Sequence, residues 1–360
     1  MSSRDLWRLY TSEFEYAAWS NESTSQLSML RDRFGRVVPN YMYPGNIGEP
    51  AVSRHLREHG FQPVYPFGRK FAVCVSHDVD ILFTKGRKLD IVSSLVRLNP
   101  GRLKKSLRQN FSRSLDEELH LKHMNAIDQS FGVKPTYYFL SVEKENTEDF
   151  NYDLEEVTGL IKWLQAQNYE IGLHGSRRAA IDENELKKEL NGIRKLVSEV
   201  HGYRNHFLKF ETPRTWRLLE SVGLQYDTTL GYSHVPGFRN GMCHPYQPYD
   251  CQEGRWMDIY EIPLIVMDVS FFLRMQLDAE MSFNLFKLLV DSVKDNNGVF
   301  TFLWHNNFLT AELRSLYEKC LAYLNSQQAW FATGKEIIDW WQDNGYFETQ
   351  KELLVKTMKE

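Results

Sequence analysis

The sequence predicts an α/β fold in which parallel strands alternate with helices and carry charged side chains at their C-terminal ends. An apolar run at 71–75 is followed at once by Ser-His-Asp-Val-Asp at 76–80. Strand-like and helix-like segments then alternate to the C-terminus, and two later apolar runs end in His174 and His305. Because the C-terminal ends of parallel strands meet on one face of such folds, these polar groups are expected to converge there.

The chain of 360 residues is long enough for one large α/β domain with an N-terminal appendage. Residues 1–68 are expected to form a helical cap, because apolar residues recur at helical spacing over 6–18 and 51–59. A loop rich in proline, glycine and asparagine joins these two segments. Residues 69–345 are expected to form the main domain, and 346–360 a frayed helical tail.

Within the main domain, segments of strand length alternate with amphipathic helical segments. Strands are expected at 71–76, 135–140, 169–174, 225–230, 261–268 and 298–305. Helices are expected at roughly 113–131, 153–167, 182–200, 213–222, 281–296 and 310–325. The lysine- and arginine-rich segment 85–108 interrupts this order, and its charge pattern favours a solvated excursion over a site for a polyanion.

Composition argues against several classes of function. The net charge of −4 and the dispersed distribution of charge give no electrostatic basis for a nucleic-acid partner. No apolar run reaches the length of a membrane span and no signal-peptide pattern opens the sequence, so a cytoplasmic location is expected. Aromatic residues make up 14% of the chain and several lie in glycine- and proline-rich loops, which is compatible with a carbohydrate ligand. The oligomeric state is not indicated.

Asp78 and Asp80 lie two residues apart, so they would project from the same face of a continuing strand. Two carboxylates on one face repel each other unless a cation or a shared proton lies between them, and a divalent metal ion is the simpler explanation. A single histidine after an apolar run is more often a hydrogen-bonded structural residue. Three polar strand ends together favour a common site.

The polar motifs follow one another in an order that resembles the sequential motifs of the NodB-type polysaccharide deacetylases, carbohydrate esterase family 4. The resemblance covers about residues 70–340, and its motifs are Ser-His-Asp-Val-Asp at 76–80, Leu-His-Gly-Ser at 173–176, Tyr-Arg-Asn-His-Phe at 203–207 and Leu-Trp-His-Asn at 303–306. It implies a distorted (β/α) barrel, a divalent metal ion and hydrolysis of an N- or O-acyl group on a sugar.

The resemblance also implies roles for individual residues. Asp78 matches the general base that acts on the attacking water, and Asp80 matches the metal-binding aspartate. Because Val79 separates two carboxylates that are adjacent in the family pattern, the division of roles between them stays open. Arg204 matches the arginine that orients the catalytic aspartate, and His305 matches the general acid for the leaving amine.

The predicted metal motif departs from the family at one position. His174 matches the first histidine of the H-x-x-x-H metal motif, but Arg178 occupies the position of the second. A hydrolytic metal ion normally has three protein ligands and an open water position. His206 is the first candidate for the missing ligand, because it would share a strand face with Arg204, and His77 is the second. Zn²⁺ is the first choice of metal, with Fe, Mn, Co and Ni as alternatives.

The segment 231–246 is rich in glycine, proline, aromatic and cationic residues and is similar to a substrate-side insert of a divergent branch of these deacetylases. Arg239 within it could hold a carboxylate or phosphate in a two-pronged grip, which would suit an acidic or nucleotide-linked sugar. The equally weighted alternative is an arginine that braces a long loop. Tyr246 and Trp304 are the aromatic candidates for contact with substrate.

The leading hypothesis is a metal-dependent hydrolase that removes an acetyl or formyl group from an amino sugar or a nucleotide-linked sugar during assembly of a surface glycan such as lipopolysaccharide or O-antigen. The competing hypothesis is a catalytically inactive relative that binds a glycan or a partner protein, because Arg178 stands where a metal ligand is expected. A third possibility is a metal-dependent hydrolase of a non-sugar amide.

Overall fold

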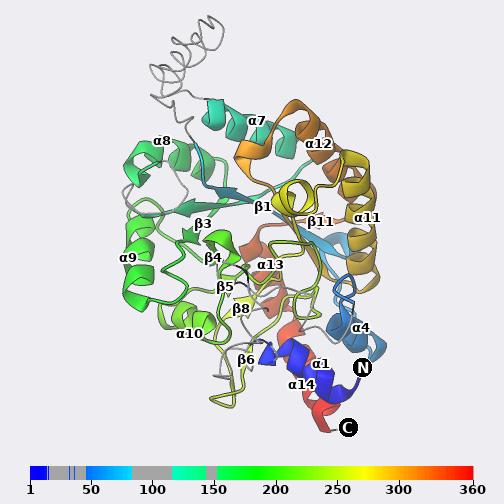
Figure 1. Cartoon of the computed structure of the whole chain (residues 1–360). Helices are drawn as coiled ribbons and strands as arrows, with labels where there is room; N and C mark the ends of the chain where they lie inside the picture. Colours follow the sequence, from blue (N-terminus) through cyan, green and yellow to red (C-terminus); the bar gives the residue numbers. More distant parts are fainter. Residues whose placement is uncertain are drawn as a thin grey trace, which may run out of the picture.

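The computed structural model describes residues 1–13, 15, 32, 36, 46–82, 116–142 and 152–359, so the predicted excursion at 85–108 lies outside the described residues. At its centre is a parallel β-sheet in the order β8-β5-β4-β3-β2-β1-β10-β9 (Figure 1). These strands are β1 (Ala72–Val79), β2 (Thr136–Leu140), β3 (Glu170–Gly175), β4 (Gly202–Asn205), β5 (Tyr226–Asp227), β8 (Tyr260–Glu261), β9 (Val266–Met267) and β10 (Val299–Leu303).

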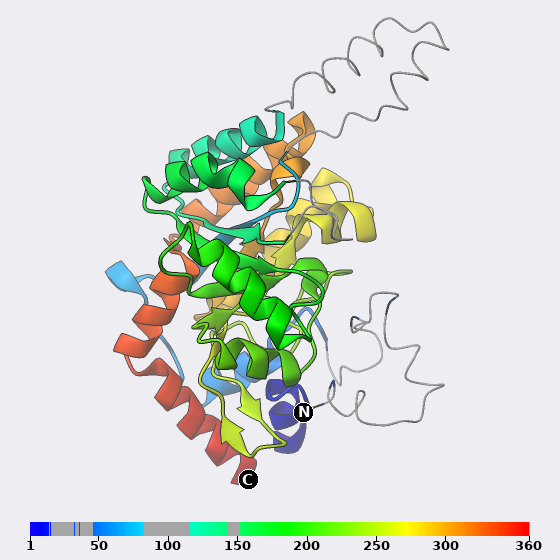
Figure 2. The same cartoon turned by 90° about the vertical axis from the view of Figure 1, so that its left-hand side faces the viewer.

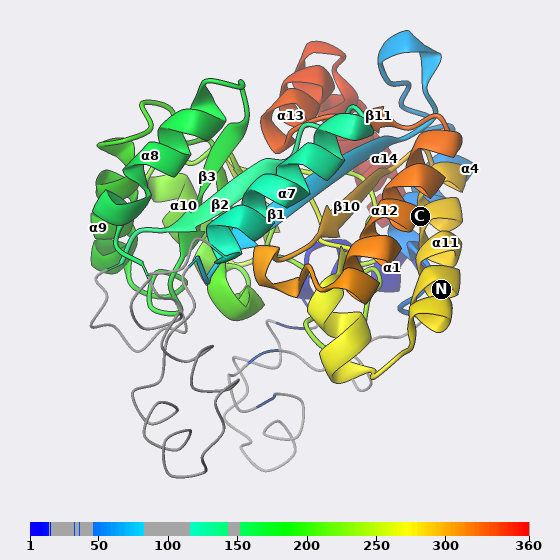
Figure 3. The same ribbon diagram turned by 90° about the horizontal axis from the view of Figure 1, so that it is seen from above.

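Helices surround this curled sheet, as the views in Figures 1 and 3 show. They are α7 (Asp116–Ser130), α8 (Leu154–Gln165), α9 (Glu183–Arg194), α10 (Arg214–Ser221), α11 (Ala279–Asp295), α12 (Ala311–Ser326) and α13 (Gly334–Asp343). Strand β11 (Trp330–Phe331) also pairs with β1, and β6 (Tyr249–Asp250) and β7 (Arg255–Trp256) form a separate antiparallel pair. The predicted α/β fold of distorted-barrel type is therefore confirmed.

The central strands are buried along their whole length, which explains why they appear in the sequence as nearly continuous apolar runs. Strand β10 shows how one face is filled: Phe300 and Phe302 both pack on Phe286 of α11, with ring centroids 5.1 and 5.0 Å apart. A rigid sheet of this kind fixes the positions of whatever side chains follow its strands.

Two parts of the strand prediction differ from the structure. Strand β4 is not among the expected strands, because Gly-Tyr-Arg-Asn contains no apolar run, and its polar side chains are buried through hydrogen bonds instead. His206 is expected on a strand face shared with Arg204, but it lies in the 3₁₀ helix that follows β4. The expected strands at 225–230 and 261–268 are regular over only two residues each in β5 and β8, with β9 formed separately. Short parallel ladders leave little periodic signal in a sequence.

The two ends of the chain meet at one end of the molecule (Figures 1 and 2). Helix α14 (Tyr346–Lys359) contacts both α1 (Ser3–Tyr10) and α4 (Ala51–Glu58). The tail is therefore a packed helix rather than a frayed one, and it buries Phe347 and Leu354 to 3% and 2% exposure. The proposed division at residues 68 and 345 stays a prediction. Among the described helices, none has both the length and the apolar character needed to cross a bilayer.

Substituting Leu354 with alanine is expected to destabilise the protein by about 2–4 kcal/mol, because it removes a buried side chain and leaves a cavity. The matched control is Leu288→Ala on α11, whose side chain is 68% exposed and whose loss should change the free energy of unfolding by less than about 0.5 kcal/mol. Chemical denaturation of both variants measures the difference. Equal effects would mean that α14 is not packed as described.

Candidate metal centre

The polar strand ends that the sequence analysis singled out meet in one pocket of about 290 Å³. Asp78 lies in β1 and Asp80 directly beyond it, His174 lies in β3, and His305 follows β10 by two residues. The lining of this pocket includes Asp78, Asp80, His174, His206 and His305. Because neighbouring parallel strands all end on the same side, residues more than 200 positions apart in sequence become neighbours.

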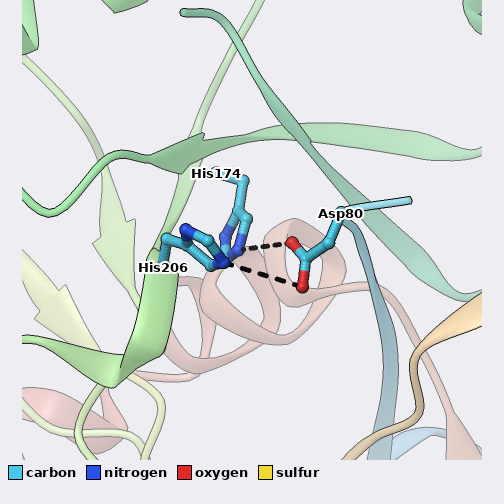
Figure 4. A group of neighbouring side chains, drawn as sticks. All are labelled: Asp80, His174 and His206. Carbon is cyan, nitrogen blue, oxygen red and sulfur yellow. Dashed lines mark ion pairs between the residues drawn. The ribbon is translucent and has the colours of Figure 1, made fainter. Parts of the chain in front are cut away.

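Asp80, His174 and His206 form a group that could bind a metal ion (Figure 4). The Nε2 atom of His174 lies 3.2 Å from Oδ1 of Asp80, and Nε2 of His206 lies 3.8 Å from Oδ2 of the same carboxylate. Tetrahedral Zn²⁺ with ligand distances of about 2.0–2.1 Å would hold two donor atoms about 3.3 Å apart. The three side chains thus offer one carboxylate and two imidazoles at close to the spacing that such an ion requires.

The hydrogen bonds of His174 provide an independent test of whether a cation fits. Its Nδ1 atom lies 2.9 Å from the backbone oxygen of Arg204, which can only accept, so Nδ1 carries a proton. In the neutral ring Nε2 then presents a lone pair towards Asp80. Both Nε2 of His174 and Oδ1 of Asp80 are buried without a properly oriented hydrogen bond. Two electron-rich atoms that face each other in this way fit a cation between them.

The electrostatic surroundings keep Asp80 ionised. Burial alone would raise the pKa of its carboxyl, but His206, His174 and His305 outweigh burial and hold that pKa well below its usual range. The pKa of His174 is raised, because burial, which lowers it, is outweighed by the carboxylates of Asp78 and Asp80. Without a metal ion a proton on Nε2 is therefore favoured, and a metal ion bound there would displace that proton. A permanently charged carboxylate is the protonation state that a metal ligand needs.

His206 enters the site through an unusual backbone segment. It opens the short 3₁₀ helix His206–Leu208 directly after β4, and the next two residues, Phe207 and Leu208, have φ values of 60° and 52°. Bulky side chains rarely adopt this left-handed conformation, and such strain is found where surrounding structure holds a functional group in place. The side-chain amide of Asn205 donates to the carbonyl of His206 at 2.9 Å and supports this turn.

Asp78 lies beside the triad and next to a buried arginine. Its Oδ1 atom is 3.7 Å from Nη1 of Arg204, and its Oδ2 atom is 3.9 Å from Nε2 of His174. The guanidinium of Arg204 donates to the hydroxyl oxygens of Ser76 and Thr228 at 3.1 and 3.2 Å. These contacts fix the guanidinium of Arg204 beside Asp78.

His305 is held by a carboxylate that the sequence analysis did not single out. Oδ1 of Asp268 lies 2.7 Å from Nδ1 of His305, and its Oδ2 accepts from the backbone N–H of His305 at 2.8 Å. Burial would lower the pKa of His305, but Asp268, Asp80 and Asp78 raise it to about 10. Asp268 ends the strand expected at 261–268, so the strand-end signal that identified Asp78 and His305 also applied to it.

Three of the residues expected to contact substrate lie outside the pocket lining. Arg239 is buried and forms two hydrogen bonds with Glu15, at 2.8 and 2.7 Å, so its carboxylate partner is supplied by the protein. Tyr246 is fully buried and packs against Tyr10, with ring centroids 5.1 Å apart. Trp304 is buried and donates from its indole nitrogen to the carbonyl of Phe308. The structure therefore corrects these three interpretations, since none of the side chains can reach a ligand in this conformation.

The structure also shows why neither Arg178 nor His77 supplies the third metal ligand. Arg178, at the position of the missing histidine, is exposed and does not line the pocket. His77 is buried, and both of its ring nitrogens are engaged, one with the carbonyl of Trp304 at 2.8 Å and one with Asp128 at 3.0 Å. His77 therefore has no nitrogen left to bind a metal ion, and His206 is the histidine that joins His174 and Asp80.

Comparison with solved structures defines the class of fold. A protein from Mycobacterium smegmatis described as a polysaccharide deacetylase is similar over 81% of this chain and 94% of its own, with a TM-score of 0.53 and 16% sequence identity. The chain thus has the fold of the polysaccharide deacetylases, in a divergent form, as the motif resemblance implied. No family model matches the sequence, and no curated protein is significantly similar to it.

Two more distant solved structures are also similar. One is a mutant of a pseudoenzyme of carbohydrate esterase family 4, with a TM-score of 0.42, 11% identity and coverage of 76% of this chain and 68% of its own. The other, from Bordetella bronchiseptica, is described as a polysaccharide deacetylase involved in O-antigen biosynthesis, with a TM-score of 0.37, 14% identity and coverage of 77% and 86%. The assignment of the fold rests on the Mycobacterium smegmatis structure.

Proposed function

We propose that this protein is a metal-dependent hydrolase that removes an N-acyl group from an amino sugar. The observation that carries the proposal is the combination of the Asp80, His174 and His206 triad with Asp78 and His305 in a single pocket. A protein that only binds a glycan has no evident need for this set of side chains. The fold shared with the Mycobacterium smegmatis protein supports the same class of reaction.

Amide hydrolysis needs an activated water, a base to receive its proton and an acid for the departing amine. A divalent ion held by Asp80, His174 and His206 would supply the activation, since it lowers the pKa of water to about 7. Asp78, oriented by Arg204, is the proton acceptor in this scheme. His305, protonated and held by Asp268, is the donor to the amine nitrogen. The metal identity, with Zn²⁺ as the first choice, is part of the proposal.

The sugar ring and the acyl group, acetyl or formyl, are not distinguished by the site. The pathway expected from the sequence, assembly of a surface glycan, and the cytoplasmic location both stay predictions. The proposal is tested by metal analysis of the unchelated protein followed by assays on N-acetylated and N-formylated amino sugars. About one equivalent of a divalent metal and release of the free amine are expected, and absence of metal after loading with each ion would contradict the proposal.

His206 is expected to be a metal ligand, so His206→Asn should lower metal affinity by at least about 100-fold, as His174→Asn should, because even residues that only support ligands contribute 10–100-fold. Arg178→Ala is the matched control, because this exposed side chain occupies the family position of the missing histidine. Its metal content should be unchanged. Competition with a chromogenic chelator measures all three affinities, and full metal retention in His206→Asn would assign the third ligand elsewhere.

A further inference from the structure

The pocket that holds the candidate metal centre is also lined by two arginines, Arg36 and Arg274. Arg36 is buried, with 6% of its side chain exposed, whereas Arg274 is exposed and belongs to the short π-helix Ser270–Arg274. Neither residue belongs to the motifs that resemble the deacetylases. Their place in the pocket therefore requires an explanation separate from the hydrolytic groups.

The two arginines differ in whether a described residue neutralises their charge. Asp32 pairs with Arg36 at 2.6 Å, and the carbonyl of Phe207 accepts from the same guanidinium at 2.9 Å. His234 also lies 3.6 Å from Asp32. Arg274 forms no ion pair or side-chain hydrogen bond with any residue that the structure describes. Arg36 is thus already paired with a carboxylate, whereas the guanidinium of Arg274 has no such partner among the described residues.

The arginines are close enough to affect each other. Burial lowers the pKa of Arg36, Asp32 raises it, and the positive charge of Arg274 lowers it further. The pKa of His234 is also lowered, first by burial and then by the positive charges of Arg36 and Arg274, which outweigh the opposite effect of Asp32. These interactions indicate a local positive potential on the pocket wall.

We propose that Arg274, next to the ion pair of Arg36 and Asp32, forms an anion subsite, and that the acylated amino sugar carries a carboxylate or phosphate group which binds there while its acyl group faces the metal centre. This inference rests on the proposed function, because it names the class of substrate for the same pocket. Guanidinium groups match carboxylate and phosphate oxygens in geometry, with paired N–H donors that a neutral hydroxyl does not need.

The pocket's size and its other walls agree with one charged sugar unit. The volume of about 290 Å³ lies just below the range of small-ligand pockets, which is about 300–1,000 Å³. Apolar side chains, among them Leu208, Met267 and Phe308, line the same pocket. Apolar walls lower the local dielectric and strengthen the attraction between an arginine and an anion. From the sequence alone Arg239 was a candidate for anion binding, but Arg239 is paired with Glu15. In this proposal Arg274 binds the anion instead.

The test measures binding rather than hydrolysis, with the full chain freed of metal by chelation so that no anion can bind to a metal ion. The probes are N-acetylglucosamine, its 1-phosphate, UDP-N-acetylglucosamine and N-acetylglucosaminuronate, titrated by calorimetry. We expect at least one anionic probe to bind about tenfold more tightly than the neutral sugar, because one charge-assisted hydrogen bond changes affinity by about that factor. That preference should decrease as the salt concentration is raised, because Arg274 is exposed to solvent and its charge is screened.

Arg274→Gln is expected to remove this preference, and Arg57→Gln, an exposed arginine on α4 outside the pocket lining, is the matched control. Preference for the phosphate probes would identify a phosphorylated or nucleotide-linked sugar, and preference for the uronate an acidic sugar; either supports the subsite. Equal binding of neutral and anionic probes, no binding of any anionic probe, or a preference that survives in Arg274→Gln would overturn it. A retained anion preference in a protein that never binds metal would instead refute only the proposed hydrolysis.

Discussion

Asp80→Asn is expected to abolish metal binding and with it hydrolysis. The substitution preserves the shape of the side chain but removes the negative charge that lies 3.2 Å from Nε2 of His174 and 3.8 Å from Nε2 of His206. Without that charge the site offers two neutral imidazoles and an amide, so metal affinity should fall by at least about 100-fold, beyond the usual effect of losing a residue that only supports a ligand. Hydrolysis should fall below detection at metal concentrations that saturate the parent.

The measurement is elemental analysis of the parent and the variant purified without chelators, followed by titration with Zn²⁺. Asp258→Asn, which removes an exposed carboxylate outside the pocket, is the control and should retain the parent's metal content. Unchanged metal content in Asp80→Asn would place the metal elsewhere. Loss of metal with folding intact, as judged by circular dichroism, would support the triad.

His305→Ala should reduce turnover by about 10²–10⁴-fold while the metal stays bound, because the variant loses proton donation to the amine but keeps Asp80, His174 and His206. A leaving group that needs less protonation should suffer less. The ratio of turnover between an amide and an ester of the same sugar should therefore change in favour of the ester. This comparison separates a lost general acid from a general disturbance of the pocket.

The control for this substitution is His59→Ala, which removes an exposed histidine outside the pocket lining. Equal loss on amide and ester would contradict the role of His305 as an acid, and full activity would remove it from the mechanism. Metal analysis must accompany both assays, since His305 lies 3.7 Å from Oδ2 of Asp80.

The pair of His305 and Asp268 also predicts how stability depends on pH in the metal-free protein. The pKa of His305 is raised from 6.5 to about 10 in the folded state, with burial opposing the shift and Asp268 as the largest favourable contribution. A raised pKa means that the pair stabilises the folded state fully below about pH 6.5. That contribution should be lost progressively as the pH rises towards 10. Thermal unfolding of the parent and His305→Ala should therefore differ most at low pH.

The sequence by itself determined the type of fold and most of the residues of the candidate site. Long buried strands such as β1 and β10 leave continuous apolar runs, and the polar residues that follow those runs are recognisable because a charge rarely follows a core strand without a reason. Asp78, Asp80, His174 and His305 could be found in this way. The order of the motifs then indicated the deacetylase fold. Because Arg178 occupies the position of the second metal-binding histidine, the sequence also indicated that another residue must supply the third metal ligand.

The tertiary structure decided which of two histidines, His206 or His77, completes the triad, because that depends on where each ring points and what it already binds. It also showed that Arg239 pairs with Glu15 and is not available to a substrate anion. Glu15 lies 224 positions away in sequence, and no local pattern encodes such a pairing. The arrangement of Arg36 beside Arg274 has the same origin. Local sequence records the periodicity and burial of each element, whereas contacts between distant loops depend on the closure of the whole sheet.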